Sequence, residues 1–291
     1  MIPAARGSIN YRHHYHAGNF ADIMKHTVLV TLLQALNRKP ASWCYYDCHA
    51  GTGGYDLRSE AAVKTGEAAH GIGRVWHAPV DRLPAPLARL REIVAASNMA
   101  LAGTDAPQFY PGSPMAAAAL ARADDRLVLA ELHPQDAQLL KNRFRTDPRV
   151  AVHVRDGYAM LQGLLPPPQR RGLVLMDPPF EKADEFAQLT EALIAAHGRW
   201  PTGMYALWYP SKEEAPVRRL QRVLQTSGIR RILLAEFHIA PPGTPGFTAC
   251  GMAIVNPPWQ GEHTLAEALG FLAQLLSPTQ GGSEVRWLVG E

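Results

Sequence analysis

From Ser113 onward, short apolar runs alternate with segments whose apolar residues recur at helical spacing. The runs are LVLA (127–130), VAVHV (150–154), GLVLM (172–176), MYALW (204–208), RILLAE (231–236) and GMAIV (251–255). Each run has the length of a buried strand, and a helix between two strands carries the chain back across one face of a sheet. The pattern therefore predicts an α/β fold with a mostly parallel sheet covered on both faces.

The amino-terminal half adds one strand, one helix and an irregular interval. The apolar run WCYY at 43–46 leads into the glycine-rich segment DCHAGTGG, which is typical of a strand feeding a tight turn. Apolar residues at helical spacing predict an amphipathic helix over 25–36. Residues 57–107 show helical patterns and several prolines but no convincing strand, so we expect a small helical insertion there.

The prediction is thus one domain over residues 11–291, built on a seven-stranded sheet. Only a Pro/Gly-rich stretch at 241–246 separates the last two apolar runs, which predicts an antiparallel hairpin at the edge of the sheet. Residues 1–10 are expected to form an N-terminal extension.

Composition excludes several protein classes. Three cysteines (Cys44, Cys48 and Cys250) without paired spacing argue against a disulfide framework or a zinc cage. No apolar run approaches the ~18 residues of a membrane span, and the N-terminus lacks a signal-peptide core. We therefore expect a soluble, cytoplasmic protein. Only six of the 29 basic residues are lysine, and the arginine excess suits phosphate contacts, although GC-rich genomes produce the same skew.

The strongest chemical motif is Asp177-Pro178-Pro179-Phe180, directly after the run GLVLM. Ligands of open α/β sheets bind beyond the carboxyl ends of the strands. The chemistry that this motif suits is methyl transfer to the N6 amine of an adenine. That amine is a weak nucleophile, because its lone pair is delocalised into the ring. The Asp177 carboxylate and the Pro178 carbonyl can accept its hydrogens, and Asp177 can take the lost proton. Phe180 offers a ring on which a base can stack. The structural alternative for the whole motif is a plain proline-rich turn after a strand.

Further polar residues follow neighbouring strands. The glycine turn at 47–54 permits close approach of a ligand, but it lacks GxGxxG spacing and a P-loop lysine. Glu131 can accept hydrogen bonds from ribose hydroxyls, and Asp156, followed by Gly157, can accept one from a cofactor's adenine amine. Ser113 can face the cofactor through its hydroxyl. Taken singly, Glu131 and Asp156 also suit turns or helix N-caps, and Ser113 suits an N-cap.

The N-terminal segment from Tyr11 to His16 mixes aromatic and basic side chains. Such a mixture can stack on bases and contact phosphates. It also resembles a metal-binding histidine tract, but no carboxylate clearly partners it and methyl transfer needs no metal. We therefore predict no metal site.

These motifs resemble the bacterial 23S ribosomal RNA adenine-N6 methyltransferases of the RlmJ family. The resemblance covers nearly the whole chain from Tyr11, through YRHHYHAGNFADIMKH, YYDCHAGTGGYDL, YPGSPM, ELHP, RDGY, LMDPPF, YALWYP and GMAIVNPPW. It implies a Rossmann-like class I methyltransferase that uses S-adenosylmethionine, binds 23S rRNA and is a monomer. By motif position the expected cofactor contacts are His26, His49, Ser113, Glu131, Asp156 and Gly157.

On the substrate side the resemblance implies that Asp177 is the proton acceptor and that Tyr11 meets the RNA. His13 and Lys25 are weaker candidates for RNA contact. Two features depart from the family. Phe180 stands where the family usually has tyrosine, which keeps stacking but removes a hydroxyl contact, and about ten residues precede Tyr11 beyond the usual start.

Three other activities remain open on the residues alone. The same chemistry could act on DNA adenine or another RNA, or on a protein amide, although amide-modifying enzymes carry asparagine where Asp177 stands. A nucleotide-dependent oxidoreductase would share the sheet but is opposed by the missing GxGxxG. A non-catalytic RNA-binding protein would leave the row of carboxylates after the strands without a role.

Overall fold

An eight-stranded sheet runs through the middle of the computed structural model, which describes residues 15–182 and 184–290. The spatial order is β10-β8-β9-β7-β6-β1-β4-β5. The five parallel strands are β1 (Cys44–Asp47), β4 (Arg126–Glu131), β5 (Val150–Val154), β6 (Gly172–Met176) and β7 (Met204–Pro210). The strands β8 (Ile232–His238), β9 (Ala249–Val255) and β10 (Gly282–Val289) complete it through antiparallel pairings.

All seven predicted strands are present, and the α/β prediction is confirmed. The pair β8 and β9 is the predicted antiparallel hairpin, but β10 lies outside β8, so the hairpin is one strand in from the edge. The count of seven was wrong because β10 was missed. None of its residues is buried, and a half-exposed edge strand lacks the continuous apolar run that marks the central strands.

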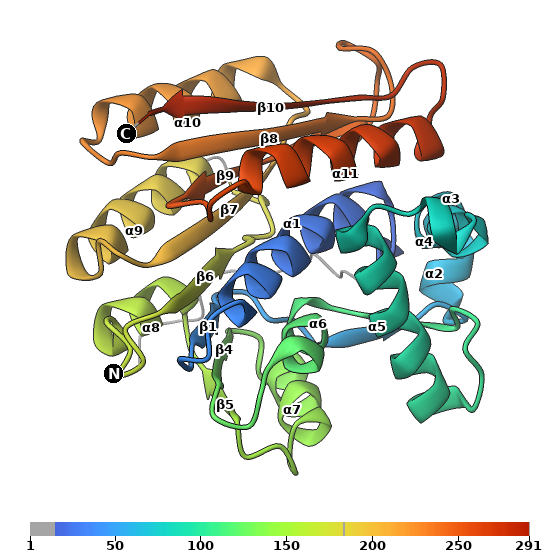
Figure 1. Ribbon diagram of the computed structural model, residues 1–291, viewed down its shortest axis with the longest axis horizontal. Helices are drawn as coiled ribbons and strands as arrows, with labels where there is room; N and C mark the ends of the chain where they lie inside the picture. The colour runs from blue at the N-terminus through green and yellow to red at the C-terminus, as the bar shows by residue number, and fades with distance from the viewer. Residues whose placement is uncertain (1–14, 183, 291) are drawn as a thin grey trace, which may run out of the picture.

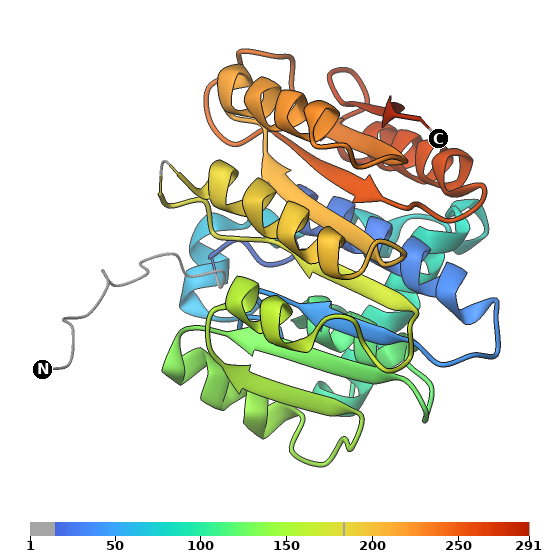
Figure 2. The ribbon, with the colours of Figure 1, turned by 90° about the vertical axis from the view of Figure 1, so that its left-hand side faces the viewer.

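Helices cover both faces of the sheet (Figures 1 and 2). One face carries α1 (Phe20–Asn37), α6 (Ser113–Leu120), α7 (Pro134–Arg143) and α11 (Gly261–Leu276). The other carries α8 (Gly157–Leu164), α9 (Glu185–Arg199) and α10 (Glu214–Thr226). Strand β6 feeds both layers, since Leu173 and Leu175 belong to one core and Val174 and Met176 to the other. This alternation follows from the two-residue period of a strand.

Helix α1 differs from the amphipathic helix predicted over 25–36. It begins five residues earlier, at Phe20, and Asn19 caps it by accepting hydrogen bonds from the backbone of Ala21 and Asp22, both at 3.0 Å. It packs against α5 (Ala85–Ala102), α6, α11 and the sheet, so its polar residues Asp22 and Lys25 are buried with the apolar ones. The sequence pattern could not indicate this second packing surface.

The segment predicted as an insertion contains α2 (Glu60–Thr65), α3 (Glu67–His70), α4 (Ile72–His77), a short 3-10 helix (Val80–Arg82) and α5. Two short strands bracket it, β2 (Gly54–Asp56) and β3 (Phe109–Pro111), and they pair antiparallel. Each has three residues, too few for a sequence pattern to mark. The proposed boundaries of the insertion and of the whole domain stay predictions. Within the described ranges, no helix has the length and apolar character to cross a membrane.

Candidate active site

A cavity of about 800 Å³ opens beyond the carboxyl ends of the parallel strands. Its wall contains every predicted site residue that the structure describes, namely Lys25, His26, His49, Ser113, Glu131, Asp156, Gly157, Asp177, Pro178 and Phe180. Tyr11 and His13 lie outside the described residues. Residues predicted from six separate segments therefore meet in one cavity, because the turns after β1, β4, β5 and β6 share one edge of the sheet.

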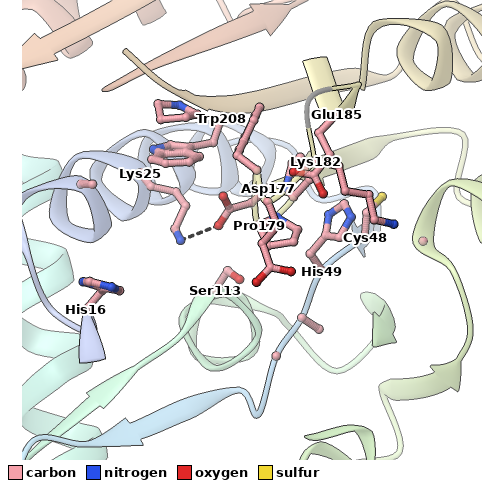
Figure 3. Close-up of a pocket in the computed structure, with 18 of the residues that line it drawn as sticks. His16, Lys25, Cys48, His49, Ser113, Asp177, Pro179, Lys182, Glu185 and Trp208 are labelled. Carbon is pink, nitrogen blue, oxygen red and sulfur yellow. Dashed lines mark hydrogen bonds and ion pairs between the residues drawn. The ribbon is translucent and has the colours of Figure 1, made fainter. Parts of the chain in front are cut away.

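Asp177 lies at the end of β6 and binds the ammonium group of Lys25 (Figure 3). The distance from Lys25 Nζ to Asp177 Oδ2 is 2.6 Å, and Asp22 Oδ1 lies 3.0 Å from the same nitrogen. Asp22 also accepts a hydrogen bond from the backbone of Gly18 at 2.9 Å. The side chains of Lys25 and Asp22 are almost fully buried, while that of Asp177 is 18% exposed toward the cavity.

These three side chains form a charge cluster of one ammonium group and two carboxyl groups. Burial lowers the pKa of the Lys25 ammonium, but Asp177 and Asp22 outweigh it and hold that pKa well above its ordinary value. Lys25 is therefore a cation that both carboxyl groups contact. Lys25 was predicted only as a weaker candidate for RNA contact, and Asp22 was not among the predicted site residues. Their spacing of three residues, which suits an ion pair on a helix, was a usable signal.

The loop after Asp177 presents an aromatic ring to the cavity. Phe180 has a φ of +51°, a backbone conformation that is uncommon for a bulky residue and is found where surrounding contacts enforce it. Its ring lies 4.8 Å from that of Phe186 and 5.8 Å from that of Trp208, measured between centroids. Two neighbouring rings thus fix Phe180 beside the carboxylate of Asp177.

Another part of the cavity wall is built from the glycine turn after β1 and from Glu131 at the end of β4. Gly51 and Gly53 have φ values of +58° and +80°, which favour glycine. Glu131 accepts hydrogen bonds from the backbone of Gly51 and of His133, both at 2.8 Å, so the carboxylate and the turn hold one another in place. Burial raises the pKa of Glu131.

The structural interpretation as a helix N-cap is confirmed for Asp156 and is wrong for Ser113. Asp156 is the N-cap of α8, accepting a hydrogen bond from Ala159 N at 2.9 Å, and it also lines the cavity. Ser113 is not an N-cap, because Gly112 holds that position. Its hydroxyl instead donates to Asp47 Oδ2 at 2.7 Å, and Tyr45 donates to the same oxygen. Asp47 was predicted only as the first residue of the glycine turn.

Several buried polar atoms in the cavity wall lack a protein partner. They include His49 Nδ1, Tyr158 Oη and Glu185 Oε2. Burial lowers the pKa of His49 to about 4, so its imidazole is neutral at pH 7. Because unpaired buried polar groups are costly, their concentration here indicates that a polar ligand completes the site. Tyr158 and Glu185 were also absent from the residues predicted.

This arrangement places a carboxylate, an adjacent ring and several polar groups in one cavity at the carboxyl edge of the sheet. Close packing sets the shape of that cavity, since a Cβ at Gly157 would lie 2.1 Å from the carbonyl oxygen of Cys48. Among residues 15–182 and 184–290, no three side chains of the metal-ligating kinds gather at one place. All three cysteines are buried and free.

Comparison with known proteins gives consistent matches. Residues 40–289 match the family described as "Ribosomal RNA large subunit methyltransferase D, RlmJ". The chain is 40% identical over 285 residues to "Ribosomal RNA large subunit methyltransferase J" of Escherichia coli, and equally to that of Haemophilus influenzae, covering 97% of this chain and 100% of each relative. A crystal structure of a Legionella pneumophila protein superposes with a TM-score of 0.86 at 32% identity, covering 93% of this chain and 98% of that one.

Proposed function

This chain belongs to the RlmJ family of ribosomal RNA large subunit methyltransferases, and on that premise we propose that it methylates the N6 amine of one adenine in 23S rRNA. The methyl donor in this proposal is S-adenosylmethionine. The observation that carries the proposal is the carboxylate of Asp177, which lies beside a cavity ring and already accepts a hydrogen bond from an ammonium group.

At the substrate end, Asp177 and the Pro178 carbonyl would accept the two hydrogens of the adenine amine. This contact pulls the nitrogen toward a pyramidal geometry and frees its lone pair. Asp177 then takes the proton that the nitrogen loses on methylation. Phe180 would stack on the extruded base, an interaction of about 1–3 kcal/mol.

Lys25 would act on this step through Asp177. Its ammonium group holds one carboxylate oxygen at 2.6 Å and leaves the other oxygen for the substrate. Asp22 fixes Lys25 from the far side.

At the cofactor end, Glu131 would accept hydrogen bonds from the ribose and Asp156 one from the adenine amine. Both oxygens of Glu131 accept one backbone hydrogen bond each, which leaves lone pairs for further donors. His26, His49, Ser113 and Gly157 would complete that pocket. When bound, S-adenosylmethionine supplies an electrophilic methyl group, and the unpartnered His49 Nδ1 supports a polar ligand at this end.

The expected partner is protein-free 23S rRNA, with the protein acting as a monomer. Extruding a base costs a few kcal/mol, so we expect an unpaired or weakly paired adenine as the target. Tyr11 as a substrate contact remains a prediction. The main alternative is methylation of adenine in DNA or in another RNA.

The test is tritiated-methyl transfer from S-adenosylmethionine to rRNA taken from a strain that lacks the gene. We expect a single N6-methyladenine in 23S rRNA, located by nuclease mapping, and we expect the wild-type strain's RNA to accept no label. Label in DNA with none in rRNA would refute the RNA substrate. Calorimetry that detected NAD binding and no S-adenosylmethionine binding would refute the reaction class.

A further inference from the structure

The cavity wall includes residues that the proposed adenine and cofactor contacts do not use. Beyond Phe180 the wall continues along the end of β7 and the start of α10, and it includes Trp208, Lys212, Arg219 and Phe247. Phe247 comes from the Pro/Gly-rich connection between β8 and β9. In Figure 3, Trp208 lies on the opposite side of Asp177 from His49. We call the part of the wall formed by Trp208, Lys212, Arg219 and Phe247 the outer region.

Three aromatic rings, those of Phe180, Trp208 and Phe247, lie next to one another in the cavity wall. The centroid of Trp208 lies 5.8 Å from that of Phe180 and 6.1 Å from that of Phe247, and both pairs are edge-on. Phe247 also contacts Phe20 at 5.0 Å, which accounts for its packing on the core side. Neither Trp208 nor Phe247 is fully buried, so both retain surface that faces the cavity.

Two exposed cations complete the same wall. Lys212 Nζ lies 5.4 Å from the centroid of Phe247, and Arg219 lies on the face of α10 that borders the cavity. Rings that bases can stack on, placed beside cations that can reach the backbone, are the elements with which proteins bind single-stranded nucleic acid.

We propose that this outer region, the Trp208–Phe247 subsite, binds the nucleotide adjacent to the target adenine. The base would contact the two rings, and its phosphate would contact Lys212 and Arg219. The inference rests on the proposed function, because it extends the RNA site past the adenine on Phe180. It predicts that the enzyme needs a single-stranded neighbour as well as an extruded adenine.

The test measures binding of a short single-stranded RNA, UUAUU, by fluorescence anisotropy, with S-adenosylhomocysteine present. A second RNA carries abasic ribose on both sides of the adenine. We expect the wild-type protein to bind the first RNA about tenfold more tightly, within the range that stacking gives. In Phe247→Leu this difference should fall to about twofold or less. Equal affinities in the wild-type protein, or an undiminished difference in Phe247→Leu, would overturn the subsite.

A salt titration tests the phosphate contact separately. Removing one contact to a single strand lowers the slope of log affinity against log salt by about 0.7, which a packing defect would not do. We expect this change in Lys212→Ala. The matched control is Lys141→Ala, an exposed lysine on α7 outside the cavity wall, which should keep the wild-type slope. Equal slopes for Lys212→Ala and wild type would contradict the phosphate contact.

Binding and methylation distinguish the two proposals. Calorimetric titration with S-adenosylmethionine establishes that each variant keeps a folded site. If rRNA is methylated but the affinity difference between the two RNAs does not depend on Phe247, the subsite fails and the proposed function stands. If the affinity difference depends on Phe247 but no rRNA is methylated, the proposed reaction fails while this binding surface stands.

Discussion

Replacing Asp177 with asparagine tests the catalytic role directly. Asparagine has nearly the same shape and keeps one oxygen that can accept a hydrogen bond, from Lys25 or from a substrate amine. It cannot accept a proton. The substitution therefore separates proton acceptance from positioning, which an alanine substitution would remove together.

Two effects are expected in Asp177→Asn, one on kcat and one on the free energy of unfolding. Loss of a general base lowers kcat by about 10²–10⁴-fold. Lys25 keeps its ion pair with Asp22 at 3.0 Å, so it does not become an unpaired buried charge. The free energy of unfolding should then fall by only about 1–2 kcal/mol, the scale of one weakened charged hydrogen bond, rather than the roughly 3–5 kcal/mol of a broken buried pair.

The assay is single-turnover methyl transfer to rRNA, with the affinity for S-adenosylmethionine measured by calorimetry. Asp184→Asn is the matched control, because Asp184 is an exposed carboxylate at the start of α9 that contacts only Gln188 in the hydrogen bonds described. It should keep wild-type turnover. If Asp177→Asn retained kcat within a few-fold, proton acceptance by Asp177 would be refuted.

Three further predictions concern the cofactor end and the stacking ring. Gly157→Ala places a Cβ 2.1 Å from the backbone oxygen of Cys48, so we expect calorimetry to show no S-adenosylmethionine binding and the free energy of unfolding to fall by about 2 kcal/mol. Gly163 lies on the same helix with open space around it, so Gly163→Ala should retain both the binding and the stability. The pKa of His49 is lowered to about 4 in the folded protein, so the unfolded chain takes up a proton first as the pH falls. The free energy of unfolding should therefore drop by about 3 kcal/mol from pH 6.5 to pH 4. Chemical denaturation should reveal a smaller drop in His49→Gln. Phe180→Ala should lower kcat/KM for rRNA by about 5- to 150-fold through lost stacking, whereas Phe180→Tyr should stay within a few-fold of wild type, and equal losses in both would contradict a stacking role.

The elements that the sequence predicted best are those whose environment leaves a local pattern. The central strands are buried on both faces, so GLVLM at 172–176 reads as a strand without any knowledge of its neighbours. Strand β10 is half-exposed at the edge, and β2 and β3 have three residues each, so their apolar content carries no such signal. Helix α1 was placed but started too late, because its polar first turn is buried by partners distant in sequence.

By itself the sequence determined seven strands of the sheet, the strand-end positions of Glu131, Asp156 and Asp177, and the family, since all of these depend on local patterns and motifs. The tertiary structure alone decided what surrounds Asp177. Lys25 precedes it by 152 residues, and their 2.6 Å contact exists only because α1 packs across the sheet beside the end of β6. Electrostatic interactions depend on distance in space, which residue spacing along the chain does not encode.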